Sequence, residues 1–277
     1  MKAETASSRL TELVALLDLE RIELNLFRAH HPAGRTGRLY GGQIMAQALR
    51  AAIATVGDGR AVHSLHGYFL RAGDPAVPAL IDVERIRDGR SFSTRRVMVT
   101  QHGQAIFAMD ASFQSAEPGF VHQAAMPDLR PPPEMKIPKA LREAPFIAWR
   151  HEHKQLLDDA PHPPHQHIWF RSSGPLPDDA ALHQSLLVYE SDNALLSTGR
   201  MPHRGSFVRS KLQMASLDHC MWFHQPALDA WRADQWLLYA LDSPSSSAAR
   251  GYNRGQIFTA EGLLVASTMQ EGLMRHR

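Results

Sequence analysis

The sequence predicts an α+β protein built from two repeats, each with one long helix wrapped by an antiparallel sheet. Two segments, 44–53 and 183–192, are apolar around most of a helical circumference, which is typical of helices inside a core. Each is followed by a series of segments with the two-residue period of strands. A proline-rich stretch separates the two series, so the chain divides into two similar halves.

The first half is predicted to contain a short helix, one long helix and five strands. Leucines at helical spacing indicate a helix over 8–18, with Ser8 as its N-cap. Tyr40-Gly41-Gly42-Gln43 opens the long helix 44–53. Alternating polar and apolar residues predict the strands, and Asp88-Gly89 is a hairpin signal between two of them. These strands are expected at 21–27, 63–70, 79–87, 92–101 and 105–114.

Residues 116–166 are predicted to link an N-terminal domain, 1–115, to a C-terminal domain, 167–277. Prolines cluster at 131–133 and again at 161–164, and such segments usually mark a boundary. One short helix is expected around 139–157. In the second domain the long helix begins at Asp178-Asp179, with Asp as its cap. Its strands are expected at 168–171, 214–223, 236–242, 251–259 and 263–270.

The two halves can be aligned with an offset that grows as loop insertions would make it grow. Tyr40 falls on His183 (183 − 40 = 143), His66 on His219 (219 − 66 = 153) and Gly103 on Gly262 (262 − 103 = 159). With these offsets, Asp192, Ser216 and Gln270 face Leu49, His63 and Ala111 of the first half. The second half therefore holds a polar cluster that the first half lacks, and we expect the first half to carry a degenerate site.

Composition excludes several classes of protein. The net charge is +2 without any run of Lys or Arg, which argues against nucleic-acid binding. No apolar run is long enough to span a bilayer, and the acidic N-terminal segment is unlike a signal peptide. The single cysteine, Cys220, allows no intramolecular disulfide and favours a reducing compartment. We therefore expect a cytoplasmic protein without a membrane or nucleic-acid partner.

Several long segments of the chain resemble the acyl-CoA thioesterase II (TesB-like) family, over nearly the whole length. They include Gly41-Gly42-Gln43, His63-Ser64-Leu65-His66, residues 87–93, Tyr189 to Asp192, Asp218-His219, residues 221–224 and residues 265–272. The resemblance implies a double-hotdog fold and hydrolysis of acyl-CoA to a free fatty acid and CoA. Coenzyme A would then be part of the substrate, and no cofactor or metal is expected. Since hotdog sheets tend to pair through their edges, we also expect a homodimer or larger homo-oligomer.

In that family, an Asp, a Thr or Ser, and a Gln orient the attacking water. The matching positions here are Asp192, Ser216 and Gln270, and Ser216 keeps the hydroxyl but not the methyl of the Thr found in many members. These side chains suit the chemistry: a carboxylate in apolar surroundings is a stronger base, and an amide carbonyl can hold a water. For the oxyanion, we expect backbone N–H groups of Gly41-Gly42-Gln43 at a helix start.

Other interpretations remain open at this stage. Ser216 as a covalent nucleophile lacks a Gly-x-Ser-x-Gly elbow, and Cys220 lies in an apolar strand where thiols are usually inert. A hotdog enoyl-CoA hydratase would require a His a few residues from Asp192, and a non-catalytic acyl-CoA-binding protein would make the polar cluster incidental. Two further sets of side chains are candidate ligands: His162, His165 and His167 for a metal, and Arg204, Arg209, Lys211, Arg250 and Arg254 for CoA phosphates.

Overall fold

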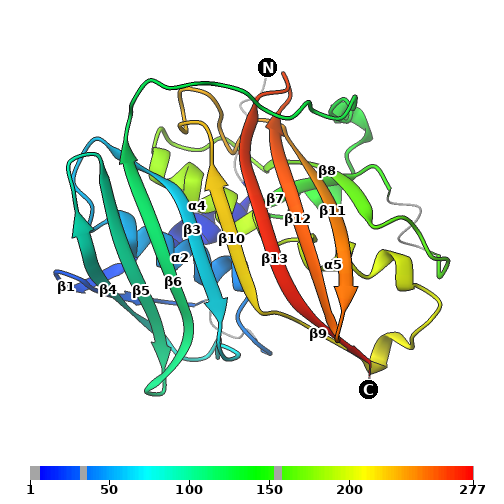
Figure 1. Ribbon diagram of the computed structural model, residues 1–277, viewed down its shortest axis with the longest axis horizontal. Helices are drawn as coiled ribbons and strands as arrows, with labels where there is room; N and C mark the ends of the chain where they lie inside the picture. The colour runs from blue at the N-terminus through cyan, green and yellow to red at the C-terminus, as the bar shows by residue number, and fades with distance from the viewer. Residues whose placement is uncertain (1–6, 32–35, 153–157, 277) are drawn as a thin grey trace.

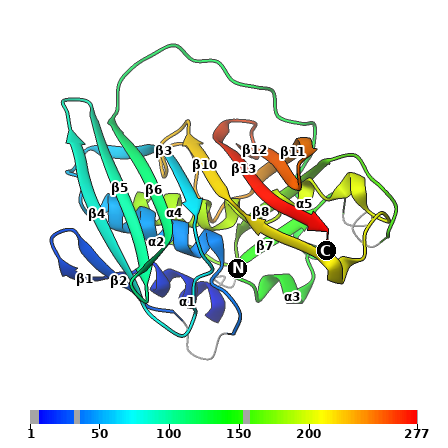
Figure 2. The ribbon, with the colours of Figure 1, turned by 60° about the horizontal axis from the view of Figure 1, so that its bottom comes forward.

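A computed structural model describes residues 7–31, 36–152 and 158–276 of the chain (Figure 1). These residues form one 13-stranded sheet in which every strand pair is antiparallel. The sheet curves around two long helices, α2 (Gly41–Ile53) and α4 (Ala180–Ser191), which lie side by side on its inner face (Figure 2). The predicted α+β double hotdog is therefore the fold that forms.

Two helices and six strands lie in the described part of the first half. Its helices are α1 (Ser8–Leu16) and α2. Its strands are β1 (Glu20–Glu23), β2 (Leu26–Ala29), β3 (Arg60–Phe69), β4 (Ala79–Asp88), β5 (Phe92–Gln101) and β6 (Gln104–Ser115).

The second half repeats this order, except that two strands, β9 and β10, stand where the first half has the single strand β3. A 3-10 turn (Glu134–Lys136) and α3 (Lys139–Arg142) lead into it. Its strands are β7 (Phe146–Arg150), β8 (His165–Ser172), β9 (Leu212–Ser216), β10 (Asp218–Phe223), β11 (Leu237–Ser247), β12 (Arg250–Thr259) and β13 (Leu264–His276). Between α4 and β9 lie α5 (Leu195–Thr198) and two short 3-10 helices.

The strand order confirms the predicted repeat. From the centre outward, the first half runs β3-β6-β5-β4-β2-β1 and the second runs β10-β13-β12-β11-β8-β7. The two halves join where β3 pairs with β10, with His66 opposite Cys220. One pseudo-two-fold relation at this junction thus interchanges equivalent strands across the sheet.

The two central helices run antiparallel and are almost fully buried, as their apolar sequences predict. The N-terminus of α2 meets the C-terminus of α4, where the Gly42 amide contacts Asp192. At the opposite end, Arg50 in the last turn of α2 pairs with Asp179, the N-cap of α4, at 3.2 Å. Arg50 lies at the negative C-terminal end of the α2 dipole and Asp179 at the positive N-terminal end of the α4 dipole, so both charges are stabilised.

Four predicted elements differ from the structure. The helix expected at 8–18 is capped by Ser7 rather than Ser8. The single strand expected at 21–27 is the hairpin β1–β2, because the Glu23 side chain accepts from the Leu24 amide and Arg21 donates to the Leu24 carbonyl, which stabilises a turn. The helix expected at 139–157 ends at Arg142 and gives way to β7; residues 153–157 lie outside the described residues. The strand expected at 214–223 is broken at Leu217.

The segment after β6 crosses the outer surface of the sheet to the second half (Figure 2). Gln123 anchors it, since its side chain donates to the Gly262 carbonyl at 2.7 Å and accepts from the Leu264 amide at 3.0 Å. Met126 and Leu129 pack there on a small apolar cluster that includes Trp169 and Leu238. Among the described helices, none has the length and apolar character needed to cross a bilayer.

Candidate active site

Asp192 lies where α4 ends, against the N-terminus of α2. It is the C-cap of α4, because Ala194 takes the left-handed conformation (φ 73°) that a continuing helix excludes. The segment 183–192, expected to be helical throughout, therefore ends with Asp192 as the cap rather than inside the helix. Its side chain is 7% exposed, and Oδ2 accepts from the Gly42 amide at 3.0 Å. The carboxylate thus caps the positive end of the facing helix.

Gln270 approaches the same carboxylate from β13. Its Nε2 donates to Asp192 Oδ1 at 2.7 Å and lies 3.3 Å from Nδ1 of His219. Its carbonyl oxygen, Oε1, is buried without a hydrogen-bond partner among the residues that the structure describes. A buried acceptor of this kind normally has a partner, so the Gln270 side chain leaves one acceptor available beside Asp192.

Ser216 reaches Asp192 because of a β-bulge. In β10 the inward-facing residues have odd numbers, such as the buried His219, so an unbroken strand would turn Ser216 outward. The register against β13 changes between Cys220↔Met269 and Ser216↔Gly272, which leaves Leu217 as an extra residue. As a result Ser216 faces inward, where it lines the same cavity as Asp192 and its hydroxyl lowers the pKa of that carboxyl. The three residues predicted from the sequence therefore meet at one carboxylate.

The bulge is present in both halves of the molecule. In β3 the pairing with β6 shifts between Val62 and Ser64, so His63 is the extra, unpaired residue of this bulge. His63 is the residue that faces Ser216 in the alignment of the two halves. It hydrogen bonds to Ser112 at 2.8 Å rather than to a carboxylate. The same backbone irregularity thus serves a polar site in one half only.

Burial dominates the electrostatics of the site. It raises the pKa of Asp192, against hydrogen bonds from Gln270, Gly42 and Ser216 that lower it. A second carboxylate, Glu190, is also buried, and burial raises its pKa to about 7 although Asn193 donates to it at 2.8 Å. Glu190 is not among the site residues expected from the sequence, because its burial is a property of the folded chain.

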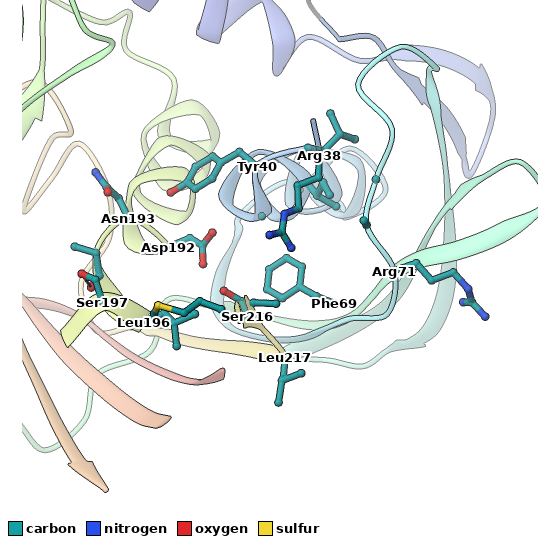
Figure 3. Close-up of a pocket in the computed structure, with 18 of the residues that line it drawn as sticks. Arg38, Tyr40, Phe69, Arg71, Asp192, Asn193, Leu196, Ser197, Ser216 and Leu217 are labelled. Carbon is teal, nitrogen blue, oxygen red and sulfur yellow. Dashed lines mark hydrogen bonds between the residues drawn. The ribbon is translucent and has the colours of Figure 1, made fainter. Parts of the chain in front are cut away.

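A cavity of about 850 Å³ opens over Asp192 (Figure 3). Asp192 and Ser216 form its polar wall, and apolar side chains form much of the rest, among them Ile44, Phe69, Leu196, Met214 and Leu217. Three arginines also line it: Arg38 and Arg71 from the first half, and Arg150 from the linker to the second half. In Figure 3 the Arg38 guanidinium turns toward the Phe69 ring, whereas Arg71 extends away from the cavity. This arrangement suits an anionic ligand with an apolar portion.

The cations predicted to meet CoA phosphates lie elsewhere. Arg250 pairs with Glu271 at 2.8 Å, Arg254 pairs with Asp242 at 2.9 Å, and the buried Arg204 donates to the Asp158 carbonyl. Lys211 does not line the cavity, and the side chain of Arg209 lies outside the described residues. No local sequence pattern singles out Arg38 or Arg150, because only the folded chain brings them to the cavity over Asp192.

The glycines at the start of α2 are required by close approach of the two helices. A Cβ on Gly42 would lie 2.2 Å from the Tyr189 carbonyl oxygen, and one on Gly41 would lie 2.8 Å from Asp192 Oδ2. The Gly42 N–H already donates its hydrogen to Asp192 Oδ2. The expectation that this amide serves an oxyanion therefore needs correction: it stabilises the carboxylate instead.

Two alternative sites lack support from the geometry. Cys220 is half-buried on the outward-facing side of β10, does not line the cavity, and has its pKa raised to about 11 by burial. His162 lies 2.7 Å from Asp158 and His167 lies 2.7 Å from Glu152. Within 7–31, 36–152 and 158–276, no three His, Cys, Asp or Glu side chains group as metal ligands would.

Comparison with known proteins finds similarity over both halves. Residues 146–273 match a family model described as acyl-CoA thioesterase, and residues 29–114 match one described as its N-terminal domain. Acyl-CoA thioesterase 2 of Haemophilus influenzae is 36% identical over 97% of this chain and 99% of its own length. The solved acyl-CoA thioesterase II TesB2 of Mycobacterium marinum is 44% identical, with a TM-score of 0.82 over 96% of this chain and 98% of that one. A hot dog fold protein of Alicyclobacillus acidocaldarius, 18% identical, has a TM-score of 0.79 over 96% and 98%.

Proposed function

Because the chain belongs to the acyl-CoA thioesterase family and hydrolyses acyl-CoA thioesters, we propose that Asp192, Ser216 and Gln270 are its catalytic residues. In this proposal, a water molecule attacks the thioester directly and no protein nucleophile forms a covalent intermediate. The observation that carries it is the arrangement of Gln270, whose Nε2 holds Asp192 while its buried Oε1 has no partner among the described residues.

A water beside Asp192 and Gln270 has two acceptors, the carboxylate and the amide carbonyl. It donates one hydrogen to each, which aims its lone pair at the carbonyl carbon of the thioester. As the new C–O bond forms, Asp192 takes a proton from the water. The tetrahedral intermediate then breaks its C–S bond, and the proton on Asp192 passes to the departing CoA sulfur. The products are a fatty acid and CoA.

Ser216 supports this step from the other side of the carboxylate. Gln270 and the Gly42 amide hold the carboxylate in one orientation, and in this proposal the Ser216 hydroxyl, which lines the same cavity, donates to Asp192 when substrate binds. The raised pKa of Asp192 makes the carboxylate a stronger base than an exposed aspartate. Arg38 at the cavity is the first candidate for contacts with CoA phosphates, since guanidinium groups bind phosphate well.

The first half (1–115) is proposed to carry no second catalytic site, with residues 116–166 as the linker to the catalytic half (167–277). Leu49 and Ala111, which face Asp192 and Gln270 in the aligned halves, are both buried apolar residues. The helix junction equivalent to Gly42–Asp192 is closed by the Arg50–Asp179 ion pair. Strand β7 lies inside the proposed linker but pairs with β8, so this part of the linker extends the second sheet.

A hydratase would require a histidine beside Asp192, and none lies within a few residues of it in the sequence. In space His219 does lie near, with Nδ1 4.0 Å from Asp192 Oδ1. However, His219 is fully buried, does not line the cavity, and faces Gln270. It has no access to a bound enoyl group, so the geometry favours hydrolysis.

The proposal is tested by free-thiol release from acyl-CoAs of graded chain length. Asp192→Asn should lower kcat by about 10²- to 10⁴-fold, the usual contribution of a general base. Cys220→Ser, on the outward face of β10, should retain wild-type turnover. Undiminished release by Asp192→Asn would overturn the assignment, and release from no acyl-CoA by the wild type would favour a binding protein.

Cytoplasmic location and homo-oligomer formation also belong to the proposal. A single cysteine suits a reducing compartment. Pairing of β3 with β10 satisfies one edge of each repeat within the chain, and the outer surface of the sheet remains for self-association. Light scattering coupled to size-exclusion chromatography should give a mass of two or more times 30.9 kDa; a mass of one chain would contradict this part.

A further inference from the structure

His219 is a buried histidine that the proposed mechanism does not use. It lies on β10, next to the β13 strand that carries Gln270, and its side chain is fully buried. It contacts Ser191 through Nε2 at 3.0 Å and Gln270 through Nδ1 at 3.3 Å. Because it is shielded from the cavity, any role in hydrolysis acts through these neighbours.

The hydrogen bonds of Ser191 determine which nitrogen of His219 carries the proton. Ser191 Oγ donates its only hydrogen to the Val188 carbonyl, at 2.9 Å. Towards His219 it can therefore only accept, so Nε2 of His219 is the donor in the 3.0 Å contact. A neutral ring with its proton on Nε2 has a lone pair on Nδ1.

That lone pair determines the orientation of the Gln270 amide. Nε2 of Gln270 has two hydrogens, one donated to Asp192 at 2.7 Å and the other directed at His219 Nδ1. If the amide were rotated by 180°, its oxygen would face two acceptors, Asp192 Oδ1 and His219 Nδ1. Only one orientation of the amide forms hydrogen bonds with both Asp192 and His219, and in it Oε1 of Gln270 points away from these two acceptors.

We propose that His219 is a positioning residue for hydrolysis: it holds the Gln270 amide in the one orientation that presents Oε1 to the attacking water and Nε2 to Asp192. This inference rests on the proposed role of Gln270 and adds the reason why that side chain does not rotate. Burial keeps His219 neutral by lowering its pKa to about 3. The nearest carboxylate, that of Asp192, lies 4.0 Å from Nδ1.

The test compares His219→Leu with His219→Asn. Asparagine can place an acceptor near the position of Nδ1, whereas leucine cannot. His219→Leu should lower kcat by about 10- to 100-fold, as small misplacements of catalytic groups do, with KM within about twofold of wild type. His219→Asn should recover most of the loss. An Asn variant as slow as the Leu variant, or a Leu variant with wild-type kcat, would overturn the proposal.

A pH profile distinguishes positioning from a merely structural role. The hydrogen bond from Gln270 lowers the pKa of Asp192, so losing it should raise that pKa. The acid limb of kcat/KM should therefore move to higher pH in His219→Leu and return in His219→Asn. If the acid limb of kcat/KM in His219→Leu lies at the same pH as in wild type, the proposal is contradicted.

A double mutant tests whether His219 acts through Gln270. His219→Leu should slow wild type but add nothing to Gln270→Ala, since coupled residues are not additive. Independent, multiplying effects would overturn the inference. If Gln270→Ala and Asp192→Asn both keep full turnover, the proposed catalytic residues are wrong, which is a different failure. Should His219→Leu not fold, Ser191→Ala removes the acceptor that fixes the tautomer and should lower kcat several-fold; unchanged kcat there would also count against the proposal.

Discussion

At the scale of single residues, two buried carboxylates lie two positions apart at the end of α4 and face different cavities. Asp192 lines the cavity of about 850 Å³, where its hydrogen-bond donors converge. Glu190 lines a smaller one of about 260 Å³, with Asn193 as its donor. The roles of the two acids therefore differ because their surroundings differ, although both have raised pKa values.

Glu190 should make the protein less stable as pH rises. The unfolded chain loses this proton near pH 4.5, while the folded chain keeps it until about pH 7. Between these values the folded state binds more protons, so the free energy of unfolding falls with rising pH. Once pH exceeds 7 the loss from this group is on the order of 3 kcal/mol.

Glu190→Gln removes this titration while keeping an acceptor for Asn193. The variant should unfold at a higher temperature than wild type at pH 8, and the two should differ little at pH 4.5. Thermal unfolding at both values, followed by circular dichroism, measures the difference. A variant that is less stable than wild type at pH 8 would show that Glu190 is held by interactions stronger than its burial.

At the scale of elements, the active site depends on how closely α2 and α4 approach and on where β9 and β10 separate. Close approach is possible because residues 41 and 42 are glycines. It lets the α2 amide of Gly42 reach the carboxylate of Asp192. The bulge at Leu217 supplies the third partner by turning Ser216 inward. The close helix approach, the Gly42 amide and the bulge at Leu217 are all properties of the backbone.

Gly42→Ala should separate the helices and damage both stability and turnover. Its Cβ would meet the Tyr189 carbonyl oxygen at 2.2 Å, and because this is backbone, an element must shift. We expect a loss of about 1–3 kcal/mol in the free energy of unfolding, as for an overpacked core, and a lower kcat.

The matched control is Gly57→Ala, at a glycine whose added Cβ meets nothing within 4 Å. It should leave the free energy of unfolding and kcat close to those of wild type. Chemical denaturation of the two variants, with thiol release measured on the same samples, provides the comparison. Equal behaviour of the two would mean that close helix approach does not limit the site.

At the scale of the whole molecule, the cavity belongs to both halves. The proposed catalytic side chains come from the second half, whereas Arg38, Phe69 and the Gly42 amide come from the first. The first half is therefore more than a scaffold, although Leu49 and Ala111 replace the polar residues of the second. The two halves thus contribute differently: the second holds the polar cluster, and the first adds side chains that line the cavity.

Arg38→Ala should weaken substrate binding more than it slows the reaction. Loss of a charged hydrogen-bond donor to phosphate costs about 1.5–3 kcal/mol, so KM should rise by about tenfold or more, while kcat stays near wild type. Arg254→Ala is the control, because its guanidinium pairs with Asp242 at 2.9 Å and Arg254 does not line the cavity. Steady-state kinetics at two salt concentrations should show a salt-sensitive KM in wild type that is reduced in Arg38→Ala.

Features that depend on neighbouring residues were readable from the amino-acid sequence. Helix α4 begins after its Asp179 cap, both central helices are apolar all round, and the hairpin at Asp88-Gly89 forms where it was expected. The repeat and the family resemblance pointed to Asp192, Ser216 and Gln270 by position. Each of these signals lies within one element or in the spacing between elements.

Only the tertiary structure decided what surrounds those three residues. The turn of Ser216 toward Asp192 depends on a bulge that is defined by the partner strand, which no local pattern reports. The contacts of Gly42 and His219 with the site join residues 150 and 51 positions apart in the chain. Burial raises the pKa of Glu190 and Asp192, and burial depends on everything packed around a side chain. Chemistry is encoded in residue types, but distance, orientation and desolvation arise only when remote segments pack together.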